Sequence, residues 1–283
     1  MKKFLLAVLF VFLLSMSASA VTEQAKENRA YFPPVIMYHD IKSRAMNEFD
    51  VLAKDFAAQL DWLKNNGYQT LSIEEFISYV KQGKDFPEKS VLITFDDGYS
   101  GVYHYAFPEL KKRGMKATVC IITDVIGVFT TVYVHVTEKQ LKNMAKSGLI
   151  SIASHTMSHS DFYLLDERAR KKELEDSKKI LEKITGKKVQ AFVYPYGNYN
   201  KEIIEAVKSA GYALSFAVGD NGYCDEPARY SIPRISMGLE LCKDDQKLFK
   251  QYIKEYKNMP SDAFIDRWKP LSEDMWRWQG REK

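Results

Sequence analysis

The sequence predicts an α/β fold in which a parallel sheet forms a distorted (β/α) barrel within a single domain. Short apolar runs recur along the chain, and amphipathic stretches of helical periodicity separate them. Because six or more such units follow one another, a closed or nearly closed barrel is favoured over an open sheet. The runs expected to form strands are residues 35–38, 91–95, 117–122, 149–153, 190–194 and 213–218.

The helices between these strands are indicated by apolar spacing and by their ends. A capping box is indicated where Ser72 precedes Glu75 and where Thr137 precedes Gln140, because each pair satisfies backbone N–H groups at a helix start. Glycines follow the other helical stretches, at positions where a left-handed residue ends a helix. The expected helices are 55–66, the two that begin at the capping boxes, 168–185 and 200–210.

Residues 1–20 have the pattern of a secretory signal peptide. A basic start precedes an almost purely apolar run over 4–14, and Ala18-Ser19-Ala20 forms a small-residue cleavage site. We therefore expect an extracytoplasmic mature chain that begins at Val21 and has no stable membrane span. It would be secreted, periplasmic or associated with the cell wall. An uncleaved N-terminal anchor is the alternative, although the apolar run is short for a membrane span.

The remaining chain divides into a lead-in over 21–34, one domain over 35–256 and a tail over 257–283 that packs on the domain. Removing residues 1–20 lowers the formal charge from +4 to +2, because they contain two lysines and no acidic residue. Lysines and arginines are scattered, so nucleic acid is not an expected partner. Three tryptophans of the tail offer stacking on sugar rings as an alternative to packing: Trp268, Trp276 and Trp278.

The three cysteines do not have the spacing of a zinc cluster. An oxidising compartment permits a disulfide between Cys224 and Cys242. Cys120 lies in an apolar run, and we expect it to be a buried thiol.

Two polar motifs follow apolar strands and suggest a metal-dependent enzyme. Asp96-Asp97-Gly98 ends one strand, and a nearby cation would relieve the repulsion between adjacent carboxylates. His155 and His159 follow another strand, at a spacing that lets both face one metal ion from the same side of a helical turn. Three protein ligands leave a position for water, as in hydrolytic metal centres. Without a metal, the aspartates would cap a helix and the histidines would be ordinary core or helix-end residues.

The two motifs together resemble the first two motifs of the NodB-homology polysaccharide deacetylases, carbohydrate esterase family four. Residues 94–98 (Thr-Phe-Asp-Asp-Gly) and 155–159 (His-Thr-Met-Ser-His) occur in the family's order, and the resemblance spans 35–236. It implies the family's distorted barrel and one divalent metal ion, usually zinc, with other divalent transition metals as alternatives. It also implies that Asp96 is the general base and that Thr156 braces the loop through hydrogen bonds. The implied metal ligands are Asp97, His155 and His159.

The third family motif is usually Arg-x-Pro-Tyr, and this chain departs from it. Val193 stands where the arginine is expected, while Pro195 and Tyr196 match. The resemblance makes the Tyr196 backbone N–H an oxyanion donor and places Pro195 and Tyr196 against the substrate. Two interpretations of Arg234 remain open. It replaces the missing arginine as the group that orients Asp96, or it is a packing or surface arginine.

The last family motif normally supplies a histidine as general acid, but no histidine follows His159. Residues 35–40 (Val-Ile-Met-Tyr-His-Asp) are similar to the N-terminal motif of the poly-β-1,6-N-acetylglucosamine deacetylase branch, where a histidine after the first strand is the acid. The similarity assigns this role to His39, with Asp40 as a neighbour in the site. A strand-end histidine without a role is the alternative. The two histidines that carry no motif, and that we interpret as structural or surface residues, are His104 and His135.

These assignments predict an enzyme that removes N-acetyl groups from GlcNAc residues of an extracellular or cell-wall polysaccharide. Water attacks the acetamide while Asp96 takes a proton and His39 protonates the leaving amine. Tyr99, beside the aspartates, is expected to line the substrate groove. Poly-β-1,6-GlcNAc is the favoured polymer, and peptidoglycan, chitin oligomers and O-acetylated polysaccharides are alternatives. A glycan-binding protein on a degenerate enzyme fold is the alternative from another class, motivated by the missing arginine and the missing C-terminal histidine.

Overall fold

The chain divides into two units, Met1–Tyr31 and Phe32–Lys283, and all residues described by the structure belong to the second. The expected signal peptide, the tail with its three tryptophans and Cys224 lie outside the described residues. Among the described residues, no helix is long and apolar enough to cross a membrane. The structure is a computed structural model that describes residues 32–130, 133–218, 228–242 and 246–255.

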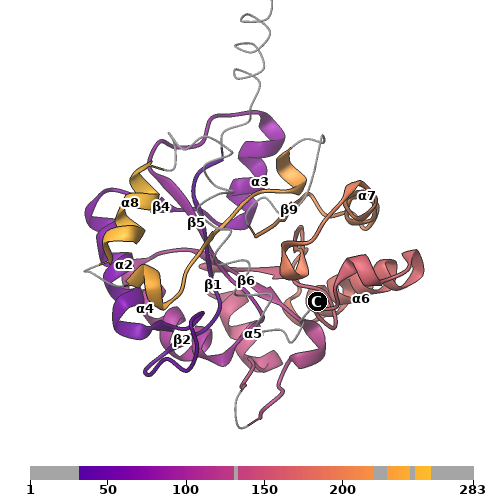
Figure 1. The fold of residues 1–283 in the computed structure, drawn as a ribbon, viewed down its shortest axis with the longest axis horizontal. Coiled ribbons are helices and arrows are strands. Elements are labelled where there is room, and N and C mark those ends of the chain that lie inside the picture. Colours follow the sequence, from indigo (N-terminus) through magenta and orange to yellow (C-terminus); the bar gives the residue numbers. More distant parts are fainter. Residues whose placement is uncertain (1–31, 131–132, 219–227, 243–245, 256–283) are drawn as a thin grey trace, which may run out of the picture. The chain divides into compact units, whose positions relative to one another are not determined.

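The centre of this unit is a parallel sheet of eight strands (Figure 1). The strand order is β10-β1-β5-β6-β7-β8-β9, with β4 paired to β5. The expected strands are present, with their ends within two residues of the prediction, whereas the two-residue strands were too short to predict. The strands are β1 (Val35–Tyr38), β4 (Gln69–Thr70), β5 (Ser90–Phe95), β6 (Ala117–Ile121), β7 (Ile150–Ser154), β8 (Ala191–Val193), β9 (Leu214–Phe216) and β10 (Ile235–Ser236). A separate pair of short strands is formed by β2 (Ile41–Lys42) and β3 (Val51–Leu52).

One short segment of chain joins the two edges of the curled sheet. Ile232 forms a parallel bridge with Phe216 of β9, and three residues later Ile235 pairs with Ile36 of β1. The segment therefore lies between β9 and β1, so the curled sheet forms a nearly closed barrel, as predicted. It also carries Arg234, whose side chain is fully buried.

Helices surround the sheet (Figure 1). Both expected capping boxes are formed, at Ser72 and at Thr137. A π-helical turn, η1 (Val102–Ala106), precedes α4 and was not predicted. The helices are α2 (Ala53–Asn65), α3 (Ile73–Gln82), α4 (Phe107–Arg113), α5 (Glu138–Lys146), α6 (Glu167–Thr185), α7 (Lys201–Ser209) and α8 (Lys247–Glu255).

The helix α3 covers the amino end of the barrel interior. Its apolar residues join an inner cluster that includes Val35, Leu92 and Cys120 from three strands. Its first turn is attached to β7, because the Ser151 hydroxyl accepts from the Ile73 N–H at 3.4 Å. The polar residues that follow the strands lie at the opposite, carboxyl end of the barrel. Barrel enzymes place their active sites at that end.

The structure describes two of the three cysteines. Cys120 is a fully buried thiol, and burial raises its pKa well above the ordinary value. Cys242 is also a free thiol, and the Gln59 side-chain amide donates to its sulfur at 3.5 Å. Cys224, the other half of the disulfide that an oxidising compartment would permit, lies outside the described residues, so that pairing stays a prediction.

Candidate metal centre and catalytic pocket

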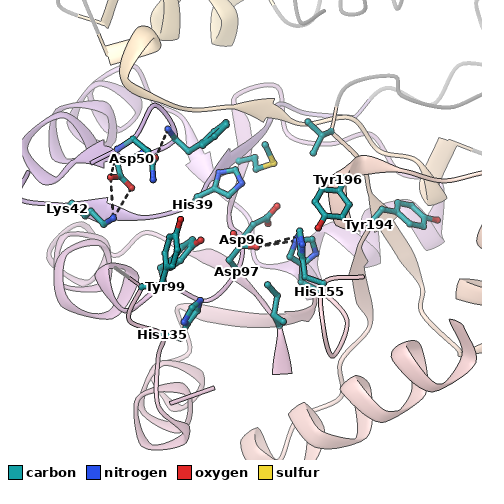
Figure 2. Close-up of a pocket in the computed structure, with 17 residues that line it drawn as sticks. His39, Lys42, Asp50, Asp96, Asp97, Tyr99, His135, His155, Tyr194 and Tyr196 are labelled. Carbon is teal, nitrogen blue, oxygen red and sulfur yellow. Dashed lines mark hydrogen bonds and ion pairs between the residues drawn. The ribbon is translucent and has the colours of Figure 1, made fainter. Parts of the chain in front are cut away.

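A pocket of about 330 Å³ gathers side chains from the carboxyl ends of several strands (Figure 2). Pro195 is buried and does not line it; this residue opens the turn η4 (Pro195–Gly197) that presents Tyr196 to the pocket. The predicted site residues that do line it are His39, Asp96, Asp97, Tyr99, His155, His159 and Tyr196.

Three of these residues form a group that could hold a metal ion. The Asp97 Oδ1 atom lies 3.5 Å from His155 Nε2 and 3.7 Å from His159 Nε2. All three ligand atoms lie within 4.8 Å of one another. Two imidazole nitrogens and a carboxylate oxygen are ligand types that zinc and other divalent metals accept, and three protein ligands leave a position for water. The donor set and its spacing therefore fit a divalent metal.

The His155 ring is fixed in the orientation that a ligand needs. Its Nδ1 lies 2.9 Å from the Val193 carbonyl oxygen. A carbonyl only accepts, so Nδ1 carries the proton and Nε2 presents its lone pair toward Asp97. Val193 stands where the family's arginine is expected, and here it contributes its backbone rather than its side chain.

The second motif is not a helical turn, which corrects the prediction. Thr156 and His159 have φ of 70° and 58°, values outside the right-handed helical region. The Thr156 hydroxyl accepts from the His159 N–H at 2.8 Å, so it braces the loop as expected. Glu173 of α6 braces the loop from outside and accepts from the N–H groups of Met157 at 2.7 Å and Ser158 at 3.0 Å. The two histidines face one point because of this irregular backbone.

Left-handed backbone conformations are concentrated at the site. Among the described residues, five non-glycine residues have positive φ, and four of them belong to the site or its loops. Such conformations are costly and persist only where the surrounding structure enforces them. Gly98 follows with a φ of 73°, which glycine adopts without strain, and a Cβ there would lie 2.9 Å from the Ile121 side chain. The four residues are Asp97, Thr156, His159 and Tyr196.

Asp96 is held by Arg234 in a buried, two-point ion pair. The guanidinium donates to Oδ1 at 2.8 Å and to Oδ2 at 2.7 Å, and both side chains are almost fully buried. Arg234 also donates to the Thr94 hydroxyl at 3.2 Å and to the Ala217 carbonyl at 3.1 Å. Burial alone would raise the pKa of Asp96, but Arg234 and then His155 hold it well below its usual range. Of the two interpretations of Arg234, the placement fits the orienting partner.

The remaining two histidines of the predicted site have different surroundings. Burial, followed by the neighbouring His155, lowers the pKa of His159 to about 4, so its ring is neutral near pH 7. His39 lies against Phe49 with ring centroids 5.5 Å apart, and its buried Nδ1 has no hydrogen-bond partner. His39 lines the same pocket as the Asp97-His155-His159 group, although it precedes Asp97 by 58 residues in the sequence.

Asp40 lies behind the pocket rather than in it. Lys42 approaches Asp40 Oδ2 at 3.5 Å and Asp50 Oδ1 at 3.2 Å. Burial raises the pKa of Asp40 to about 6, although the Lys42 charge opposes that shift. Lys42 and Asp50 themselves line the pocket.

Several lining residues carry no sequence signal. His135, which we expected to be structural or at the surface, lines the pocket with Tyr133. Tyr194, Phe49 and Asn47 also line it and belong to no recognised chemical motif. His104 is exposed and outside the pocket, in agreement with the prediction. A barrel that gathers an Asp-His-His group and a buried, arginine-paired aspartate in one pocket has the composition of a hydrolytic metal centre.

Comparisons with known proteins agree with that class. The sequence model of the polysaccharide deacetylase family matches residues 83–215. The Bacillus subtilis protein YxkH is 39% identical over 202 residues, which cover 71% of this chain and 70% of that protein. The poly-β-1,6-N-acetyl-D-glucosamine N-deacetylase of Staphylococcus epidermidis is 33% identical over 223 residues, which cover 76% of this chain and 74% of the relative.

Solved structures give the same result. The Streptococcus pyogenes deacetylase PplD, in complex with acetate, aligns with a TM-score of 0.69 and 28% identity over 78% of this chain and 97% of PplD. IcaB from Ammonifex degensii aligns with a TM-score of 0.66 and 25% identity over 78% of this chain and 99% of IcaB. The chain belongs to the polysaccharide deacetylase family and is an enzyme of that family.

Proposed function

We propose that the protein removes N-acetyl groups from GlcNAc residues of an extracytoplasmic polysaccharide of the poly-β-1,6-GlcNAc type. The observation that carries this proposal is that His39 lines one pocket with Asp96 and the Asp97-His155-His159 group. The chain thereby has a proton donor despite the missing C-terminal histidine. The Staphylococcus epidermidis relative supports the choice of polymer, and the signal-like residues 1–20 support the location.

A divalent metal, with zinc as our expectation, would be held by Asp97, His155 and His159. When bound, it supplies a Lewis acid that polarises the acetamide and makes water a stronger acid. The protein prepares the site for this role. Val193 keeps the proton of His155 on Nδ1, and burial keeps His159 neutral.

Asp96 acts as the general base in this proposal. Its pKa is held well below the usual range, so near pH 7 it is ionised and able to accept a proton from water. The two bonds from Arg234 occupy one lone pair on each oxygen, and each oxygen retains another. Arg234 therefore orients Asp96 without blocking it.

His39 acts as the general acid. Cleavage of an amide needs a proton on the departing nitrogen, because an amide anion is a poor leaving group. The Tyr196 N–H is proposed to donate to the developing oxyanion. The rings of Tyr196 and Tyr99 are proposed to contact the sugar. Pro195 contributes by shaping the turn that presents Tyr196.

Acetate release from several polymers tests this function. The wild type, the metal-stripped protein and Asp96→Asn are incubated with poly-β-1,6-GlcNAc, peptidoglycan, chitin oligomers and an O-acetylated polysaccharide. We expect release from the first polymer by the wild type, loss after metal removal and restoration by added zinc. Asp96→Asn should bind metal and release little acetate.

The alternatives give different results in the same experiment. Release only from peptidoglycan, chitin or O-acetylated polymers would reassign the substrate. Binding to a glycan without release from any polymer would identify a glycan-binding protein. Turnover that survives metal removal would contradict the mechanism.

A further inference from the structure

The rings of Tyr99 and His135 lie on the side of Asp97 away from Tyr196 (Figure 2). Together with Tyr133, which packs on Tyr99, they form what we call the ring wall of the pocket. The Tyr99 ring stacks on the His135 ring with centroids 5.0 Å apart and planes inclined by 26°. The Tyr133 ring also contacts the Tyr99 ring, with centroids 5.8 Å apart. All three residues line the pocket, and the chemistry proposed above gives no role to Tyr133 or His135.

The backbone holds this ring wall in place. Tyr99 and His135 form an antiparallel bridge, so the segment after β5 and the later loop are paired across the pocket rim. The Ser100 N–H donates to the Val134 carbonyl at 2.8 Å, and the Val136 N–H donates to the Gly98 carbonyl at 2.9 Å. The rings are therefore presented by a rigid support that begins directly at the metal group. Preorganised contact surface of this kind loses little conformational entropy on binding.

The exposure of the rings argues for a ligand rather than for internal packing. Tyr99, Tyr133 and His135 are half-buried and face the pocket. Phe129 on the same loop is 79% exposed and does not line the pocket, so the loop does not simply bury its aromatic residues. Lys42, Asn47 and Asp50 also line the pocket, and Lys42 and Asp50 lie on the same side of Asp97 as Tyr99 (Figure 2).

We propose that Tyr99, Tyr133 and His135 form a subsite for the pyranose ring next to the one that is deacetylated. A pyranose presents C–H groups on its faces and hydroxyls at its rim, which matches an aromatic wall bordered by polar side chains. The subsite lies on the Asp97 side of the pocket, away from Tyr196. This proposal rests on the proposed function, and it predicts that the enzyme prefers oligomers to a single sugar.

Chain-length dependence tests the subsite. KM and kcat are measured on GlcNAc and on a β-1,6-linked GlcNAc pentamer for the wild type, Tyr133→Leu, Tyr133→Phe and His135→Ala. Tyr133→Leu keeps apolar bulk but removes the ring, and it should raise KM for the pentamer roughly three- to tenfold, the range of an aromatic contact. The kcat on the pentamer and the KM for GlcNAc should change less than twofold. Tyr133→Phe should behave as the wild type, and His135→Ala as Tyr133→Leu.

Phe129→Ala is the matched control, because it changes an exposed aromatic of the same loop outside the pocket. Pentamer binding by calorimetry gives a second readout that needs no turnover. Weaker pentamer binding by Tyr133→Leu than by Phe129→Ala supports the subsite even if the wild type releases no acetate, a result that would overturn only the proposed function. Equal effects of Tyr133→Leu on GlcNAc and pentamer, or no effect on either, would overturn the subsite.

Discussion

The Asp97-His155-His159 group proposed to bind metal, here the metal side, and His39, the proposed acid, here the acid side, are built by different means. On the metal side, left-handed backbone and short hydrogen bonds fix the side chains proposed as ligands. On the acid side, the His39 ring packs against the Phe49 ring, and the buried His39 Nδ1 has no hydrogen-bond partner among the described residues. Phe49 lies in a loop tied by Asp50, whose carboxylate accepts from the Met46 N–H at 2.7 Å and from the Asn47 N–H at 3.2 Å.

The difference follows from what each side must do. Metal ligands lose affinity when they stray by fractions of an ångström, so they need rigid support from a second layer of residues. The proposed proton donor holds no metal, so the same demand for a fixed position does not apply to His39. The comparison predicts that changes on the two sides separate metal binding from turnover.

The largest effect is expected from His155→Ala. This variant loses a proposed metal ligand. Mutating even a residue that only hydrogen-bonds to a ligand typically costs about 10–100-fold in metal affinity or activity, so we expect kcat/KM to fall roughly a thousandfold or more. Metal analysis of the purified protein should show a substoichiometric ion. His104→Ala is the matched control, because His104 is exposed and outside the pocket. Full metal content in His155→Ala would remove it from the ligand set.

His39→Ala should separate the two sides. We expect kcat for the amide substrate to fall roughly 10²–10³-fold, within the usual range for a general acid, while metal content stays unchanged. An acetate ester with a phenolate leaving group needs no protonation, so its hydrolysis should fall much less. Parallel losses on the amide and the ester would refute the acid role of His39.

Arg234→Gln should affect the base through its pKa. Without the guanidinium, burial of Asp96 is uncompensated and its pKa rises, so the acid limb of the kcat/KM profile should move to higher pH. We expect kcat/KM to fall roughly ten- to a hundredfold near pH 6 and by a smaller factor near pH 9. This loss is smaller than the full contribution of a general base, about 10²–10⁴-fold, because Asp96 itself is retained. A pH profile with an unmoved acid limb would contradict the pairing.

The same variant should lose stability in a pH-dependent way. Breaking a buried ion pair typically costs about 3–5 kcal/mol of unfolding free energy. Because the folded pKa of Asp96 is lowered, the pair's contribution is present above the unfolded pKa near 3.9 and is lost as pH falls through the lower folded value. Urea unfolding at pH 7 should therefore separate the wild type from Arg234→Gln more widely than unfolding below pH 3.

How much the sequence could predict differs between the two sides for physical reasons. The Asp97-His155-His159 group lies in short motifs directly after apolar strands, and the family resemblance of these motifs was enough to predict it. Arg234 stayed ambiguous because 138 residues separate it from Asp96 and only the closure of the barrel brings them together. The conformation of the second motif was predicted wrongly, because a four-residue spacing does not distinguish a helical turn from a loop with left-handed residues. Nothing local marks Tyr133 or His135, since a bridge to Tyr99 places His135 and a ring contact joins Tyr133 to Tyr99.

The smallest effect is expected from Glu173→Gln, on the metal side. Glu173 does not line the pocket, and its carboxylate accepts from two N–H groups and from the Ser158 hydroxyl at 2.7 Å. Gln retains one acceptor oxygen and loses the charge, so the loop should hold His159 less firmly. Metal affinity should fall about tenfold, the lower end for a supporting partner, while kcat at saturating zinc stays within twofold. Glu175→Gln, on the same helix and outside the pocket, is the matched control. A fall in kcat that saturating zinc does not restore would show that Glu173 acts on turnover itself, and the proposed division between the two sides would fail.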